Sequence, residues 1–483
     1  MDPLPTARHI AHRGCAGARL FATAVTLLLT GVTAAQNPTS DPVILAIEPL
    51  LDSQSAVVRG EAALALAATG ESKYHADILG LAVDPEPAAR HRAILALGLL
   101  GQPGSDILLS RVLKKSARDS DERFLAALAL GLLPDEPRVP AIDEFFNRAS
   151  SASRKRIRTE LVCVLIGFRK LPHPQRMTTL RGFISDATYR NRAELSLVIE
   201  SLARVPSAQN REAFLGQLGT KNSEILMASL TALADRRVKF QRSHWERILH
   251  LAEHAPTPGV RARALDLLAF HRQAEALGVA GRALLGQAPE SVAAAIRTVL
   301  TLGGSPLREG VEDRILATAE PMLQAAMLRA KKVPHGDDFV KACIAISRDA
   351  ERSFEVRAGA TKIVAEAGWK ELLPTATQLF LSARDRESAE RLALAMERLG
   401  ATIDDKFLPA KTVEEVALLP MRLRALMSAG SVNAFKILLG LLTKPPSNGL
   451  QLDALRAYRS VRLDFLDNTS RALLPPLLRK LLE

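Results

Sequence analysis

The sequence predicts an all-α protein, a right-handed α-solenoid of about 13 helical hairpins that ends in a C-terminal capping helix. A short apolar helix, a polar turn and an Ala/Leu-rich helix recur about every 30 to 37 residues along the 483-residue chain, as in stacked helical repeats. Signals for β-hairpins are nearly absent. Hydrophobic residues make up 47% of the chain and aromatic residues only 4%, which favours closely packed helices with an aliphatic core.

The first residues have the pattern of an export signal. Arg8, Arg13 and Arg19 precede an apolar stretch at 20–32, and small residues at 33–35 offer a cleavage site. The stretch is shorter than the about 20 residues that a membrane-spanning helix needs. We therefore expect an exported protein, periplasmic or secreted, with residues 1–35 as a signal peptide and 36–42 as a linker. The alternative is an uncleaved membrane anchor formed by residues 20–35.

The repeats are predicted to occupy residues 43–463. The clearest copies are 50–70, 81–101 and 113–133, and weaker copies include 254–270 and 352–368. In each copy, an apolar residue about four positions before the end of the second helix serves as an anchor for alignment. The anchors are Leu66, Leu97, Leu130, Leu165, Ile199, Leu233, Leu267, Leu300, Leu328, Val364, Met396, Leu426 and Ala457.

The second helix of each repeat is predicted to be the buried one. In the first repeat Val58, Ala62, Ala65 and Leu66 fall on one helical face. Glycines that need a left-handed backbone are expected to end such helices. They are Gly70, Gly101, Gly303, Gly368, Gly400 and Gly430. Residues 464–483, broken by Pro475-Pro476, are predicted to form a C-terminal helical cap, because a terminal repeat needs an atypical outer face.

The repeats also share a motif, a turn aspartate followed by an arginine at the start of the second helix. It reads Asp52…Val58-Arg59, Asp84-Pro85…Arg90, Val260-Arg261 and Val356-Arg357. This pattern resembles HEAT repeats, and more narrowly the short Ala-rich type of phycobilisome-lyase-like HEAT proteins; residues 137–206 depart from it. In that family the turn aspartate and the arginine tend to pair from repeat to repeat. The resemblance therefore implies a structural ladder of Asp52, Arg59, Asp84, Arg90, Arg261 and Arg357.

Charge and cysteine content restrict the possible functions. The net charge is +12, and about +10 without residues 1–35, with both signs interspersed as on a solvated surface. Basic clusters at 154–158, 114–115, 236–239 and 331–332 leave nucleic-acid binding as an alternative. No aromatic residues for base stacking are interleaved with them. Cys163 and Cys343 lie in apolar helical contexts and are expected to be buried thiols.

One motif could support catalysis. His250-Leu-Ala-Glu253-His254 matches the H-x-x-E-H arrangement, which places two histidines on one helical face as zinc ligands beside a possible base. The repeat pattern supplies no dedicated third ligand, and His254 also suits the end of a helix. Nucleotide-binding glycine loops and zinc-finger cysteine spacings are absent. A zinc-dependent hydrolase through these residues therefore stays an alternative, and no cofactor is expected.

The function that the sequence favours is a non-catalytic scaffold that binds a protein partner of unknown identity along a concave face. Solenoids present long surfaces built from successive helices. The candidate contact residues lie on second helices outside the apolar stripe and are Arg92, Arg123, Arg263 and Arg391. A lyase-like chromophore-handling role is a further alternative, which only the family resemblance suggests.

Overall fold

The structure is a computed structural model. It describes residues 41–115, 121–134, 155–169, 172–186, 194–303, 305–333, 335–401, 413–445 and 447–462. This part of the chain contains 24 α-helices, several short 3-10 turns and no β-strand. None of these helices is both long and apolar enough to cross a membrane. The predicted signal peptide and the predicted C-terminal cap lie outside the described residues.

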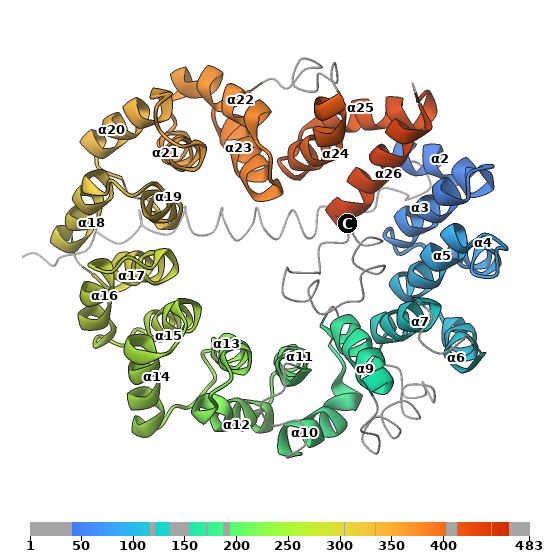
Figure 1. The fold of residues 1–483 in the computed structure, drawn as a ribbon, viewed down its shortest axis with the longest axis horizontal. Helices are drawn as coiled ribbons and strands as arrows, with labels where there is room; N and C mark the ends of the chain where they lie inside the picture. Colours follow the sequence, from blue (N-terminus) through green and yellow to red (C-terminus); the bar gives the residue numbers. More distant parts are fainter. Residues whose placement is uncertain are drawn as a thin grey trace, which may run out of the picture.

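The helices form two concentric layers (Figure 1). Each inner helix packs against the next one along the chain, and the outer helices cover them. The inner helices are α3 (Ala56–Ala67), α5 (Pro87–Leu100), α7 (Asp121–Leu132), α9 (Lys155–Phe168), α11 (Glu194–Ala203), α13 (Ser223–Ala232), α15 (Pro258–Phe270), α17 (Pro289–Leu302), α19 (Pro321–Ala330), α21 (Phe354–Glu366), α23 (Arg386–Arg398), α24 (Val413–Ser428) and α26 (Asn448–Arg462). The outer helices are α2 (Pro42–Ile47), α4 (His75–Leu81), α6 (Ser105–Lys115), α10 (Met177–Ser185), α12 (Ala208–Gly216), α14 (Arg242–His254), α16 (Ala276–Leu284), α18 (Ser305–Ala317), α20 (Asp337–Arg348), α22 (Leu373–Ser382) and α25 (Val432–Thr443).

The predicted all-α solenoid is confirmed. Twelve of the thirteen anchors lie within different inner helices. The thirteenth, Leu233, directly follows α13 as its C-cap residue. All of them are buried apart from Leu300, which is partly exposed. The second helix of each repeat is therefore the inner one, because a helix with neighbours on both sides and an outer helix behind it can bury most of its surface.

The solenoid closes into a ring, which the sequence did not predict. The last described helix, α26, packs against α3, and α25 packs against α2 (Figure 1). The described ends of the array therefore cover each other. Terminal repeats of an open solenoid expose an apolar end and need a polar cap. Here the C-terminal repeat occupies the position that a repeat preceding the first one would have.

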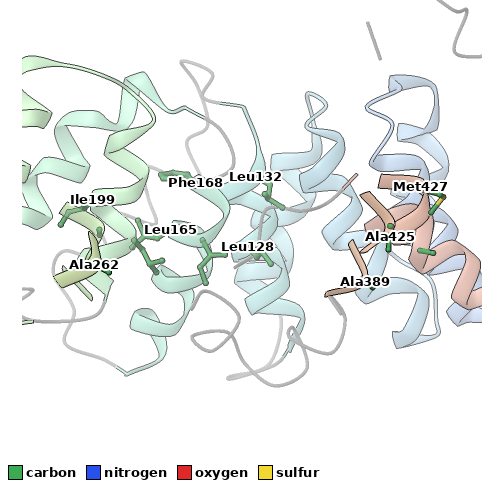
Figure 2. Close-up of a cluster of buried hydrophobic side chains, with 14 of the residues drawn as sticks. Leu128, Leu132, Leu165, Phe168, Ile199, Ala262, Ala389, Ala425 and Met427 are labelled. Carbon is green, nitrogen blue, oxygen red and sulfur yellow. The ribbon is translucent and has the colours of Figure 1, made fainter. Parts of the chain in front are cut away.

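The inner helices pack most closely between α5 and α9. A Cβ atom on Gly98 would lie 2.5 Å from Cα of Ala129, and one on Gly131 would overlap the backbone oxygen of Val164. Figure 2 shows the core at α7 and α9, where Leu128 and Leu165 are fully buried. Small residues allow this approach because only they leave room for a neighbouring backbone at that distance.

The ends of the helices match the predictions in part. Five of the six glycines have the left-handed backbone expected, whereas Gly303 has φ −81° and an extended conformation. The prediction was wrong there because the chain leaves α17 without reversing through a left-handed turn. The turn aspartates Asp52 and Asp84 precede the N-cap residues, which are Ser55 for α3 and Glu86 for α5.

Candidate protein-binding site on the inner face

Arg92 and Arg123, predicted as exposed contacts, are buried between inner helices. Nε of Arg92 on α5 donates to Glu61 on α3 at 3.0 Å, and the residue is only 9% exposed. Arg123 on α7 pairs with Glu160 on α9, also at 3.0 Å. The expectation of exposure was wrong for both residues. Successive inner helices pack so closely that the position just outside the apolar stripe faces the neighbouring helix instead of solvent.

Glu61 connects α3 and α26, the first and last of the described inner helices. In addition to Arg92, its carboxylate pairs with Arg459 on α26 at 3.0 Å and lies 3.7 Å from Arg456. The side chain of Glu61 is 1% exposed and that of Arg459 is 4% exposed. Burial lowers the pKa of Arg459, and the nearby Glu61 charge opposes that shift. Ring closure therefore uses the same kind of inter-helix ion pair that joins α3 to α5.

The turn residues near the starts of the inner helices form a second series of contacts. Arg59 pairs with Asp84 of the next repeat at 2.9 Å and donates to the backbone oxygen of Ser53 at 2.7 Å. Arg90 repeats this geometry, with Glu122 at 2.8 Å. Although burial raises the pKa of Asp84, its hydrogen bonds from the Glu86 amide and the Arg59 side chain outweigh that effect, and the pKa is lowered.

The other residues of the implied ladder behave differently. Arg261 donates to the backbone oxygen of Ala255 at 2.6 Å, and Arg357 to that of Ser347 at 3.1 Å. Neither has a carboxylate partner among the described residues. Asp52 is exposed, and no bond from it to another described residue is found. In these repeats the arginine therefore holds its own turn to the helix instead of joining one repeat to the next.

Arg263 and Arg391, the other two predicted contacts, line the same groove on the inner face. The groove has a volume of about 610 Å³ and runs from α13 to α23. Arg297 and Arg329 line it as well, so four arginines from four different inner helices border one space. Spacing along the sequence could not show this, because the curvature of the ring decides which inner helices share a groove.

Three of these arginines have hydrogen-bond partners. Arg297 makes a two-point ion pair with Asp266, at 2.9 and 2.8 Å, and Arg391 pairs with Glu387 at 2.8 Å. Nε of Arg263 donates to Thr231 at 2.9 Å. Burial lowers the pKa of Arg263 and of Arg391, which means that each cation is partly removed from water.

The H-x-x-E-H motif lies on the outer helix α14, away from this groove. The rings of His250 and His254 are 4.9 Å apart between centroids. Glu253 forms an ion pair with Arg282, and His254 is 62% exposed at the end of the helix. No group of three potential metal ligands occurs within the described ranges. The structure thus brings the two histidines together without adding a third ligand from this part of the chain.

The remaining sequence candidates have local roles where they are described. Lys331 is 1% exposed and pairs with Glu312 at 2.8 Å, and Arg237 pairs with Asp235 at 2.9 Å, so these members of two basic clusters are engaged within the protein. Cys163 and Cys343 are buried free thiols, as expected. Burial raises the pKa of Cys343 to about 12, which disfavours the reactive thiolate.

Comparison with known protein families agrees with this architecture. A family model described as HEAT repeats matches residues 44–131, which span α2 to α7. No curated protein matches the chain. A solved structure that is similar is the crystal structure of Kap121p, with a TM-score of 0.33 and 13% identity, covering 95% of this chain and 59% of that one. The chain is an all-α solenoid, and its residues 44–131 are similar to HEAT repeats. The narrower likeness to phycobilisome-lyase-like proteins stays a prediction.

Proposed function

We propose that this protein is a non-catalytic scaffold that binds a protein partner on the inner face of the ring. The observation that carries the proposal is the groove from α13 to α23. Its lining combines apolar side chains such as Met227 and Met322 with arginines and carboxylates. Protein-binding surfaces typically combine apolar contacts with charged groups that select the partner. Rigid helices hold these side chains in a fixed arrangement, so a partner meets a preformed surface.

Site-specific photo-crosslinking tests this proposal. A photoreactive amino acid would replace Met322, which is 56% exposed in the groove, and in a matched protein Leu285, which is 75% exposed at the end of the outer helix α16. We expect one protein to crosslink through position 322, to be identified by mass spectrometry, and not to crosslink through position 285. Crosslinking only through position 285, or to no protein at either position, would contradict the proposal.

We further propose that the protein works outside the cytoplasm. The support is the basic, apolar and small-residue order within residues 1–35. Fusion of these residues to a reporter that is active only after export gives a direct test. Export of the reporter, and its loss when apolar residues at 20–32 are replaced by charged ones, is the expected result.

A further inference from the structure

Four arginines crowd the groove between α13 and α23, and two of them lack a carboxylate partner. Among the described residues, Arg329 has neither an ion pair nor a side-chain hydrogen bond, and the only such bond of Arg263 is to Thr231. By contrast, Arg297 and Arg391 are each paired with a carboxylate. The groove therefore holds two cations whose charge no neighbouring carboxylate of the described chain neutralises by direct contact.

These two cations stand in an environment that strengthens binding of an anion. Burial lowers the pKa of Arg263; the nearby Asp266 charge opposes this shift, and the Arg297 charge adds to it. Burial likewise lowers the pKa of the half-buried Arg391, a shift that the Glu387 charge opposes and the Arg329 charge reinforces. A guanidinium group that is partly desolvated and close to another cation gains more from a carboxylate than one in bulk water does. An incoming anion would reduce the repulsion between neighbouring arginines.

The rest of the lining favours a peptide over a nucleic acid. Carboxylates of Asp266, Glu290 and Glu387 alternate with the arginines and would repel a continuous phosphate backbone. The lining contains no aromatic ring on which a base could stack. Alanines at 262, 293 and 326 leave room for a partner's backbone between the charged side chains. This mixed pattern fits a chain that carries separated carboxylates.

The spacing of the two cations sets the length of that chain. Arg263 lies on α15 and Arg329 on α19, with α17 between them. Packed helices are about 8–10 Å apart, so the two positions are separated by about 16–20 Å. An extended peptide covers that distance with about five or six residues.

We propose that the groove binds an extended acidic segment of a protein partner, with carboxylates about five residues apart paired to Arg263 and Arg329. This inference rests on the proposed scaffold function and adds the chemistry of the partner. In this proposal Arg263 and Arg329 determine which peptide segments the groove binds.

Selection from a random peptide library on the full-length protein tests the inference, followed by fluorescence anisotropy with the selected peptides. We expect peptides with two Asp or Glu residues about five positions apart. Arg263→Gln and Arg329→Gln should each weaken their binding by about tenfold, as loss of a charged hydrogen bond does. The matched control is Arg242→Gln, which removes the same charge from α14, where that side chain is 93% exposed. Thermal unfolding of each variant verifies that the fold is retained.

Other outcomes would overturn the inference in distinguishable ways. Selected peptides that crosslink at position 322 but are neutral or basic would refute the acidic partner and leave the scaffold function standing. If no peptide binds and no protein crosslinks at position 322, both proposals fail. Equal binding of a single-stranded oligonucleotide, reduced by the same two substitutions, would show a general polyanion site instead. If Arg242→Gln weakens peptide binding as much as the two groove substitutions do, the peptides are attracted by the overall charge of the protein and not by a specific site.

Discussion

The N-terminal arc of the ring (α3 to α9) and its middle arc (α13 to α23) use the same repeat in different ways. In the N-terminal arc the positions just outside the apolar stripe, such as Arg92 and Arg123, are buried in ion pairs between helices. In the middle arc the corresponding face is open enough for Arg263 and Arg329 to line a groove. The residue types are alike, so the surroundings of each arginine decide whether it joins inner helices or lines a groove.

The two arcs also differ in how closely neighbouring atoms approach their glycines. Gly98 and Gly131 allow backbones to touch in the N-terminal arc. In the middle arc a Cβ atom on Gly359 of α21 would lie 2.9 Å from Cβ of Leu328 on α19, whereas one on Gly259 or on Gly281 of the outer helix α16 would meet no atom within 4 Å. Residues 44–131, which match the HEAT-repeat model, overlap the N-terminal arc. Backbone-to-backbone contact between inner helices therefore marks the N-terminal arc, although the middle arc has a close approach of its own at Gly359.

The largest difference between the arcs should appear when an acidic partner of an inter-helix ion pair is neutralised. Glu61→Gln leaves two buried arginines, Arg92 and Arg459, without their charge partner, and should cost about 3–5 kcal/mol. Asp266→Asn removes a more exposed pair with Arg297 and should cost about 1 kcal/mol or less. Urea unfolding followed by circular dichroism gives both values.

Hydrogen exchange locates the effect of the first substitution. Because Glu61 joins α26 to α3, its replacement should speed amide exchange in both helices, while exchange in α17 stays unchanged. Equal costs for the two substitutions would refute the proposed difference between the arcs. Arg459→Gln, which removes the α26 side of the pair with Glu61, should reproduce the faster exchange in α26.

Added side-chain volume should give the second largest difference. Gly131→Ala places a methyl group on the backbone oxygen of Val164 and should destabilise the protein by about 3 kcal/mol, since neither backbone can move without disturbing its other neighbours. Gly281→Ala in α16 meets no atom within 4 Å and should stabilise by about 0.5–1 kcal/mol, the helix preference of alanine over glycine. Thermal unfolding measures both, and a neutral Gly131→Ala would show that the close contact is dispensable.

The smallest effect concerns acid stability in the middle arc. Burial raises the pKa of Glu366, but the His335 hydrogen bond at 3.1 Å and the Lys362 charge outweigh it, so the pKa is lowered. The folded protein therefore binds this proton less readily than the unfolded chain. The resulting stability is present above the ordinary glutamate pKa of about 4.3 and is lost as the pH falls through the lower folded value.

Glu366→Gln should remove the pH-dependent stability that the ionised Glu366 side chain provides. We expect a loss of about 1–2 kcal/mol at pH 7, as for a hydrogen bond to a charged group, and a flatter fall in stability below about pH 5. Urea unfolding across this pH range checks both expectations. Glu246→Gln is the control, because its pair with Arg242 is largely exposed on α14. An unchanged pH slope in Glu366→Gln would assign the acid sensitivity to other carboxylates.

Patterns along the chain were enough to predict the repeat, its thirteen anchors and the second helix as the buried one. These features depend on apolar residues spaced within a single helix and on turn residues beside it, and such short-range patterns are visible in the chain. The burial of both cysteines follows from the same local patterns. Leu66 and Ala457 could therefore be assigned to equivalent positions before any contact between them was known.

The folded arrangement was needed to show that the solenoid closes, that Arg92 and Arg123 are buried, and that Arg263 and Arg391 share a groove. Each repeat adds a small rotation to the one before it, and the sum over the whole array brings α26 to α3. No local pattern specifies that sum. Glu61 and Arg459 lie at opposite ends of the chain, and their ion pair exists because the accumulated curvature places them in contact.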